Sequence, residues 1–423
     1  MKQSGIDWIG EIPDDWKINQ LSQIVSQVKN KNTGLKENNL LSLSYGKIKR
    51  KNINTNDGLL PASFDGYNII SDGDIVLRLT DLQNDHTSLR VGRATEQGII
   101  TSAYTTLHPV DYDNSKYLYY ILHSFDLKKG FYGMGSGVRQ GLNYDEVKTL
   151  KVPLPPKATQ QRIAEYLDSE CAQIDSIIEE SKKSIEEYKA WKQSVIFEAV
   201  TGKNLNCKKK DSGIEWIGEI PEGWKIKRFK FVATSLEKGA GITKEEVFED
   251  GDTPCVRYGE IYSKYNQSFS NCISKTYSSK IPVQKYFTNG DILFVGTGEL
   301  VEEIGKCIAY LGNETCLAGG DIIIAKHKQN PSFLSYAMNS SYAQNQKSRN
   351  KAKLKVVHIS ATEIGDVQIF LPPLPEQESI AKMLDSKCAQ IDSLIAEKES
   401  LIADLTEYKK SLIFEVVTGK RSV

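Results

Sequence analysis

The stretch Ser4-Gly-Ile-Asp-Trp-Ile-Gly-Glu-Ile-Pro-Asp-Asp-Trp-Lys-Ile18 returns almost unchanged as Ser212-Gly-Ile-Glu-Trp-Ile-Gly-Glu-Ile-Pro-Glu-Gly-Trp-Lys-Ile226. A second repeated stretch is longer and runs from Pro153 to Lys203 and again from Pro372 to Lys420. Both of its copies contain Ile-Ala-x-x-Leu-Asp, Cys-Ala-Gln-Ile-Asp-Ser and Val-Thr-Gly-Lys, in that order. The first pair is offset by 208 residues and the second by 217, so the two halves of the chain differ by only nine residues.

The regions between the repeated stretches, residues 20–150 and 227–370, share little identity. Solenoid repeats have periods of about 20–50 residues, so a period this long indicates a duplicated domain. One repeated frame around two divergent inserts predicts a single scaffold that presents two different recognition surfaces.

The composition is typical of a globular protein, with 39% hydrophobic and 26% charged residues, and 423 residues allow two to four domains. The chain has no run of about 18 apolar residues and no stretch of signal-peptide character at its start. We therefore expect a cytoplasmic protein with no membrane span. The seven cysteines include no Cys-x-x-Cys pair, which favours buried free thiols in a reducing cytosol over a zinc site.

A long helix should follow each Leu-Pro-Pro segment, because proline and the residue before it resist helix. Residues at alternating steps of three and four give each helix an a/d stripe. In the second copy the stripe is Ile391, Leu394, Lys398, Leu401, Leu405, Tyr408 and Leu412. In the first copy it is Ile174, Ile177, Ser181, Ser184, Tyr188, Trp191 and Val195, which is weaker but backed by Ile178 and Ile185. Gly202 and Gly419 are natural helix ends.

Each helix of about 40 residues would form a rod of about 60 Å at 1.5 Å per residue. A helix with an exposed apolar stripe needs a partner, and its repeat mate is the obvious one. The alternative, two core helices in separate domains, fits their length poorly. The candidate residues of the helix and subunit interface are Ile174, Ile177, Tyr188, Trp191, Val195, Ile391, Leu394, Leu401, Leu405, Tyr408 and Leu412.

The inserts show strand signals at matching places. Asp72-Gly-Asp-Ile-Val-Leu77 and Asn289-Gly-Asp-Ile-Leu-Phe294 predict a turn followed by a strand, again 217 residues apart. The apolar stretches Gly98-Ile-Ile and Asp321-Ile-Ile-Ile-Ala325 predict buried strands.

Each insert ends with a capped short helix, because Asn143-Tyr-Asp-Glu146 and Ser360-Ala-Thr-Glu363 are capping boxes. A strand and the long helix should follow. The loops before these helices are Gly133-Met-Gly-Ser-Gly-Val-Arg-Gln140 and Asn350-Lys-Ala-Lys-Leu-Lys355. Flexible glycines with one arginine occupy the place that a ladder of lysines takes in the other copy. Equivalent loops with different chemistry are what two related recognition sites would show.

The net charge is zero, which argues weakly against nonspecific coating of nucleic acid. Local charge is more informative: residues 47–51 carry four positive charges and residues 347–355 carry five, and neither run contains an acid. Either run alone would be read as a solvated surface loop. One run in each insert indicates a polyanionic partner.

No enzyme signature emerges from the sequence. It has no Gly-x-x-x-x-Gly-Lys-Ser/Thr nucleotide loop, no His-Glu-x-x-His and no Asn-Pro-Pro-aromatic or Asp-Pro-Pro-aromatic tetrapeptide. Phe294-Val-Gly-Thr-Gly-Glu299 predicts a strand and turn rather than a cofactor loop, since no helix pattern follows it. Asp72 and Asp74 are better explained as turn-forming residues than as metal ligands. We therefore expect no catalytic residue, no cofactor and no metal.

Taken together, these motifs resemble the specificity subunit of Type I restriction-modification systems. The resemblance rests on Trp8-Ile-Gly-Glu-Ile-Pro and its copy at Trp216, on Leu-Pro-Pro-Leu-Pro-Glu-Gln at 371–377 with its variant at 154–161, and on the duplicated helix motifs. It covers the whole chain. The first copy departs from the pattern in having Lys157-Ala-Thr-Gln-Gln where Leu-Pro-Glu-Gln is usual.

The resemblance implies an α+β fold in which two globular α/β target-recognition domains are separated by two long helices that form an antiparallel coiled coil, an internal pseudo-twofold repeat. The expected boundaries are 1–152 for the first recognition domain with repeat segment 4–18, 153–203 for the central helix, 204–370 for the second recognition domain with repeat segment 212–226, and 371–423 for the C-terminal helix.

The implied function is recognition of a bipartite site in double-stranded DNA without catalysis. Two modification subunits, which are adenine methyltransferases, would dock on the helices, and restriction subunits would join them. A rod of about 60 Å can hold two readers about one DNA turn apart. The candidate DNA-contacting residues are Lys47, Lys49, Arg50, Lys51, Arg139, Gln140, Lys347, Arg349, Lys351, Lys353 and Lys355. The alternatives are a coiled-coil adaptor that does not bind DNA and an autonomous enzyme with an unrecognised motif.

Overall fold

The computed structural model describes residues 1–53, 61, 63–85, 87–134, 141–298, 300–349, 351 and 357–423. The fold is α+β, as expected. The chain divides into two compact units, one of Met1–Lys182 with Glu399–Val423 and the other of Lys183–Lys398. These units differ from the four predicted segments, because each long helix contributes one part to each unit and is not a domain of its own.

The first unit is built on a four-stranded antiparallel sheet. Its strands are, in spatial order, β4 (Val25–Gln27), β11 (Thr105–Pro109), β8 (Ile75–Leu77) and β9 (Val91–Arg93). The smaller pairs are β1 (Lys2–Gln3) with β2 (Glu11–Ile12), β3 (Lys17–Gln20) with β12 (Lys151–Leu154), β5 (Leu41–Ser44) with β6 (Lys47–Arg50), and β7 (Asn68–Ile70) with β10 (Gly98–Ile100). Helices α1 (Ser115–Leu127) and α2 (Tyr144–Val147) complete the globular part.

The second unit contains two larger sheets. The first has the order β16 (Ala233–Lys238), β25 (Ile322–His327), β21 (Ile292–Val295), β23 (Cys307–Tyr310) and β18 (Ser268–Phe269). The second has the order β19 (Ser274–Thr276), β17 (Thr253–Val256), β24 (Cys316–Ala318) and β20 (Tyr286–Phe287). The smaller pairs are β13 (Lys209–Asp211) with β14 (Glu219–Pro221), β15 (Lys225–Arg228) with β27 (Gln368–Leu371), and β22 (Thr297–Gly298) with β26 (Val357–His358). The shorter helices are α4 (Tyr258–Ser263), α5 (Pro331–Asn339), α6 (Ser341–Lys347) and α7 (Ala361–Asp366).

The duplication seen in the sequence is present in the fold. Strands β16, β25, β21 and β23 repeat the spatial order of β4, β11, β8 and β9. The predicted strand signals are confirmed, since β8 and β21 follow their turns at the expected places and both are buried. Both capping boxes are confirmed as well, with Asn143 capping α2 and Ser360 capping α7.

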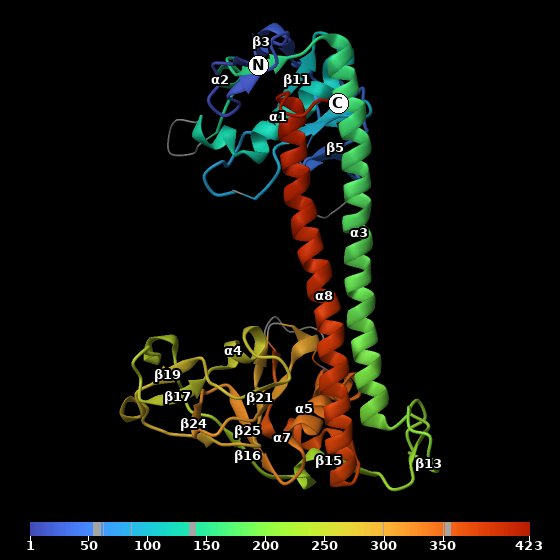
Figure 1. Ribbon diagram of the computed structural model, residues 1–423, viewed down its shortest axis with the longest axis vertical. Coiled ribbons are helices and arrows are strands. Elements are labelled where there is room, and N and C mark those ends of the chain that lie inside the picture. Colours follow the sequence, from blue (N-terminus) through green and yellow to red (C-terminus); the bar gives the residue numbers. More distant parts are fainter. Residues whose placement is uncertain are drawn as a thin grey trace. The chain divides into compact units, whose positions relative to one another are not determined.

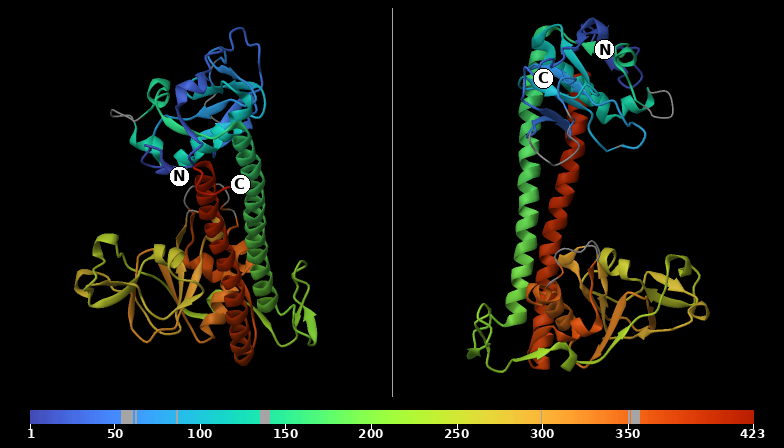
Figure 2. Two further views of the ribbon diagram at one scale, coloured as in Figure 1. Left: turned by 45° about the horizontal axis from the view of Figure 1, so that its top comes forward. Right: turned by 180° about the vertical axis from the view of Figure 1, so that it is seen from behind.

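The two long helices, α3 (Lys157–Thr201) and α8 (Leu374–Val417), run antiparallel beside each other (Figure 1 and Figure 2). In the first unit Leu412 and Val416 of α8 share a core with Leu167 of α3. In the second unit Leu384 of α8 shares a core with Val200 of α3. Helix pairing is therefore present in each unit separately.

The predicted a/d stripe is wrong at every second position. Ile174, Ile391 and Leu412 are buried, as expected. Five of the other predicted residues are exposed, namely Ile177 (43%), Trp191 (47%), Leu394 (37%), Leu401 (36%) and Tyr408 (44%). The remaining ones, Tyr188, Val195 and Leu405, are half-buried.

The buried face lies one residue further along at those positions. On α3 it passes through Ile178 and Ile185 instead of Ile177 and Ser184. The two possible stripes share every seventh residue, and both offer apolar side chains in between. Spacing alone therefore could not distinguish them.

Each repeated N-terminal segment packs against the end of a long helix. Gly419, just after α8, has a φ of +72°, and a Cβ there would lie 2.4 Å from Pro13. Gly202, just after α3, has the same φ, and its Cβ would lie 2.5 Å from Pro221. Glycine is needed at both places for the left-handed helix end and for this close approach. In each unit, a repeated N-terminal segment therefore packs against a repeated helix end, a contact that the sequence did not reveal.

Two expectations from composition can be compared with the structure. All seven cysteines are free, and five are buried, but Cys207 is exposed and Cys272 is half-buried. Within the described part of the chain, no helix combines the length and apolar character needed to cross a membrane.

Candidate nucleic-acid interface

Each unit brings two loops together at the same place in its repeat. In the first unit the 78–90 loop joins β8 to β9, and the N–H of Leu142 donates to the carbonyl of Leu79 at 2.9 Å. In the second unit the 296–306 loop joins β21 to β23, and the N–H of Ile359 donates to the carbonyl of Gly296 at 2.9 Å. Leu142 comes two residues, and Ile359 four residues, after the loops that the sequence singled out. The two bonds are 217 residues apart at both ends, so the duplicated frame ties each hairpin loop to the same position of its repeat.

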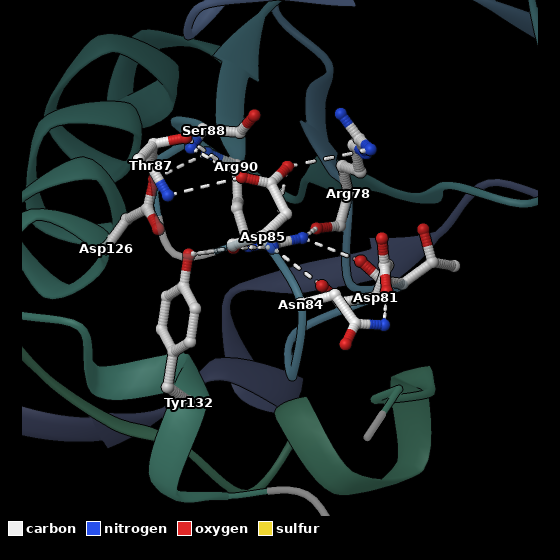
Figure 3. A network of polar contacts seen from close by, with 10 residues as sticks. Arg78, Asp81, Asn84, Asp85, Thr87, Ser88, Arg90, Asp126 and Tyr132 are labelled. Atoms are coloured by element: carbon white, nitrogen blue, oxygen red, sulfur yellow. Dashed lines mark hydrogen bonds and ion pairs between the residues drawn. The ribbon is translucent and has the colours of Figure 1, made fainter. Parts of the chain in front are cut away.

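The 78–90 loop is folded around a buried arginine (Figure 3). The side chain of Arg90 is fully buried, with 0% exposure. Its Nη1 donates to the carbonyls of Arg78 (3.2 Å) and Thr80 (2.7 Å), and its Nη2 donates to those of Asp81 (3.2 Å) and Asp85.

The fifth N–H of the guanidinium, on Nε, donates to the hydroxyl of Tyr132 at 3.0 Å. All five N–H groups of Arg90 therefore have an acceptor, and four of these are loop carbonyls. Since only arginine offers five donors in a fixed plane, this residue fixes the path of the loop.

Two carboxylates, those of Asp126 and Asp85, hold the backbone of the 78–90 loop near Arg90. The backbone N–H of Arg90 donates to Asp126 of α1 at 2.6 Å. The pKa of Asp85 is held well below its usual range, chiefly by hydrogen bonds from the side chain and backbone of Ser88. The backbone N–H of Thr87 and the positive charge of Arg90 lower it further. Tyr132 also donates to the carbonyl of Asp85 at 2.9 Å, which ties the loop to the 3-10 helix Gly130–Gly133.

The 296–306 loop is held from outside. Lys347, the last residue of α6, is buried and its Nζ donates to the carbonyl of Gly305 at 2.8 Å. Gln344 of the same helix donates to the carbonyls of Val301 and Ile304, both at 3.2 Å. Burial lowers the pKa of Lys347 to about 8. In the second unit, a lysine and an amide from a neighbouring helix thus bind the loop carbonyls, whereas in the first unit one arginine binds them.

The predicted basic run of the first insert is exposed. Lys47, Lys49 and Arg50 lie on β6 and Lys51 follows it. Arg50 forms an ion pair with Glu96, and Lys47 lies 3.8 Å from Asp175 of α3. Arg139 and Gln140 fall outside the described residues.

Two lysines of the basic run in the second insert, Lys347 and Lys351, are not exposed as the spacing suggested. Lys347 is buried, as described above. The side chain of Lys351 is only 14% exposed and forms an ion pair at 2.7 Å with Glu363, the capping-box partner of Ser360 in α7. Arg349 is exposed, and Lys353 and Lys355 fall outside the described residues.

A cleft of about 640 Å³ in the second unit, which the sequence did not indicate, is lined by three cationic side chains and by the carboxylates of Glu260 and Asp321. Lys244, Arg257 and Lys264 line it together with the backbone of several glycines. Arg257 is fixed there, because its Nε and Nη2 both donate to the buried carboxylate of Glu260 at 3.0 and 2.8 Å. Within the described residues, no group of three or more His, Cys, Asp or Glu side chains is arranged to hold a metal ion.

Sequence reasoning missed the 78–90 loop and Arg90. The only available signal was the length of the polar stretch between two strand signals, since hairpin connections are usually two to five residues. Nothing in the sequence distinguishes Arg90 from the neighbouring Arg78 or Arg93.

Comparisons with known proteins agree on one family. The model of the Type I restriction modification DNA specificity domain matches residues 13–187 and 221–402, one match in each half of the chain. The Type I restriction enzyme MjaVIII specificity subunit of Methanocaldococcus jannaschii is 24% identical over 429 residues, which cover 97% of this chain and 93% of that protein. The EcoKI specificity subunit of Escherichia coli is 22% identical over 295 residues, covering 67% of this chain and 62% of that protein.

Solved structures share the fold. A chain from a structural study of complex assembly and conformational transition of the type I R-M system superposes with a TM-score of 0.71 at 15% identity, covering 97% of this chain and all of that chain. The HsdS subunit from Thermoanaerobacter tengcongensis gives a TM-score of 0.55 at 15% identity, covering 100% of both chains. Because the family model matches more than half of the sequence, once in each copy of the repeat, this chain belongs to the Type I restriction modification DNA specificity domain family.

Proposed function

We propose that this chain is the DNA sequence-recognition subunit of a Type I restriction-modification complex. Each unit reads one half of a bipartite site in double-stranded DNA. The observation that carries the proposal is the pair of equivalent loop sites, one in each family match, built on the same frame but with different chemistry. A frame that holds geometry constant while the loops differ is suited to reading two different half-sites.

The exposed cations give such a reader its general affinity for DNA. Lys49, Lys51 and Arg349 are exposed, and no ion pair involves them within the described residues. Contacts of this kind bind phosphates and carry no sequence information, so base contacts must come from other side chains. The neutral net charge of the chain is compatible with this, because basic residues form local runs in the inserts, at 47–51 and 347–355.

The long helices would set the distance between half-sites and dock the partner subunits. Helix α3 has 45 residues, which corresponds to a length of about 65 Å at 1.5 Å per residue. Two adenine-specific modification subunits would bind the helices, and restriction subunits would join that core. The chain itself would contribute no catalytic group.

Exchange of one insert tests this proposal. Residues 20–150 are replaced by the corresponding insert of a relative, the modification complex is reconstituted, and N6-methyladenine is mapped by sequencing. We expect one half of the methylated target to change while the other half and the spacer stay the same. Exchange of residues 227–370 is the matched control and should change the opposite half. An exchange that altered both half-sites would contradict the proposal.

The main alternative is a coiled-coil adaptor that does not bind DNA, which the paired helices alone would allow. Electrophoretic retardation of duplex DNA at increasing salt separates the two. The recognition subunit, with its modification subunits, should bind with an affinity that falls steeply as salt rises. An adaptor would show no retardation at any salt concentration.

A further inference from the structure

We propose that the 78–90 loop reads base edges in one DNA half-site, with Gln83 and Asn84 as the reading residues and Arg90 as the residue that positions them. The ligand is the edge of an adenine base exposed in the major groove. This inference rests on the proposed function and deepens it. None of these residues was a candidate from the sequence.

The construction of the loop is the first argument. It has thirteen residues, whereas hairpin strands need only two to five to connect them. Such a loop would ordinarily carry many backbone conformations, yet here four of its carbonyls are bound to one buried guanidinium. Burying a charged group is costly unless all of its hydrogen bonds are made, and here they are. A loop that only connects two strands does not need a buried arginine to fix its path. A loop that must present side chains in one geometry does.

The surface that the loop presents is the second argument. Leu82 points inward and is completely buried, which anchors the middle of the loop. Its described exposed residues are Thr80, Asp81, Gln83, Asn84 and Thr87, all polar. Protein interfaces depend on buried aromatic and apolar anchors, which this tip does not offer among its described residues. A polar tip with fixed geometry is suited instead to hydrogen bonding with bases.

The chemistry of the tip indicates which base. Asparagine and glutamine side chains pair with adenine in the major groove, accepting from its N6 amino group and donating to N7. The amide of Asn84 is already oriented, because its Nδ2 donates to the carboxylate of Asp81 at 2.8 Å. Gln83 is adjacent and exposed. The 78–90 loop is also tied to the segment at Leu142, whose N–H donates to the carbonyl of Leu79 at 2.9 Å.

Arg90 acts through the loop and does not itself touch DNA, since it is fully buried. Lysine could keep its charge but offers three donors in place of five and has no planar fork. An Arg90→Lys change therefore removes the bond from residue 90 to at least two of the five acceptors. The loop should lose its fixed path while the sheet beneath it remains.

The double variant Gln83→Ala with Asn84→Ala tests the reading role. The full complex with modification subunits is assayed for methylation of its own target, and binding to nonspecific duplex is measured alongside. We expect the rate on the cognate target to fall about 10- to 100-fold and at least one base position of one half-site to become tolerant of substitution. Nonspecific binding should stay the same. Gln3→Ala is the matched control, because it removes an exposed amide from β1 in the same unit, away from the loop and the long helices, and should behave as wild type.

The variant Arg90→Lys tests the positioning role. It should relax the same base position as the double variant, without changing the other half-site. Loss of activity on both half-sites equally would show a general structural role and overturn the positioning part. A double variant with wild-type rate and unchanged base preference would overturn the inference. A wild-type complex that methylates no bipartite site would instead overturn the proposed function, so the two failures can be told apart.

Discussion

The two units hold the same hairpin loop in opposite ways. In the first, the stabilising cation belongs to the loop itself, and Arg90 gathers four loop carbonyls around its side chain. In the second, the cation comes from α6, and Lys347 makes a single bond to the loop at Gly305. The sheet below has the same order in its first four strands in both units. The difference teaches that the frame fixes where a loop begins and ends, whereas each insert supplies its own means of shaping it.

Removing the two cations should affect the units unequally. Arg90→Met removes one donor from each of four loop carbonyls, although those of Asp81 and Asp85 keep bonds from the Asp85 N–H and the Tyr132 hydroxyl. We expect the local free energy of opening to fall on the order of 2–5 kcal/mol. Lys347→Met removes the Lys347 donor from only one carbonyl, that of Gly305, and also removes a buried charge. These two effects oppose each other, so the local free energy of opening should change little. Hydrogen exchange of the amides in residues 78–90 and 296–306 measures both effects. Equal loss of protection in the two loops would contradict this comparison.

The helix frame should respond equally in the two units. Ile174 and Ile391 are repeat mates, with exposures of 5% and 1%, and replacing either by alanine should cost about 2–5 kcal/mol. Their neighbours Ile177 and Leu394 are 43% and 37% exposed, and the same change there should cost less than about 1 kcal/mol. Denaturant unfolding of the four variants gives the comparison. A larger cost at Ile177 than at Ile174 would restore the stripe that the sequence suggested.

Lys347 should make the stability of the second unit depend on pH. Burial lowers its pKa from 10.5 to about 8, so between these values the unfolded chain binds the proton that the folded chain has released. Stability therefore rises with pH across this window. The destabilisation is fully present below pH 8 and fades towards pH 10.5. Between pH 7 and 9.5, wild type should gain about 2 kcal/mol relative to Lys347→Met. Parallel pH curves for the two proteins would show that Lys347 does not titrate in this range.

The smallest effect concerns two matched ion pairs between the helices. Lys409 lies 2.6 Å from Asp175 in the first unit, and Lys192 lies 2.7 Å from Asp392 in the second. The four residues are repeat mates, and all are partly exposed. Each pair should contribute about 0.2–1 kcal/mol, as measured by double-mutant cycles with Asp→Asn and Lys→Met, and less at high salt. Coupling energies that differ widely between the pairs would show that the frame is less symmetric than its sequence.

Much of the frame could be predicted because it is encoded by local signals. The turns before β8 and β21, the capping residues Asn143 and Ser360, and the glycines that end the long helices each act over a few residues. The loop anchors could not be predicted in this way. Arg90 binds carbonyls five to twelve residues away, and Lys347 binds one 42 residues away, so neither leaves a pattern in its neighbourhood. Lys347 even misled the sequence interpretation, because a buried lysine and an exposed one look the same in a run of basic residues.

The two compact units are built from different parts of the chain, and this decides which of them can fold first during synthesis on the ribosome. The second unit is continuous, from Lys183 to Lys398, and can close its core as soon as that segment has emerged. The first unit must wait, because its core includes Leu412 and Val416, and the hydroxyl of Tyr117 donates to the carbonyl of Val417, 300 residues later. Until then, the apolar faces of α1 and of the first turns of α3 remain uncovered. Synthesis from the N-terminus therefore completes the later unit first, and the earlier one spends most of translation as an aggregation-prone intermediate.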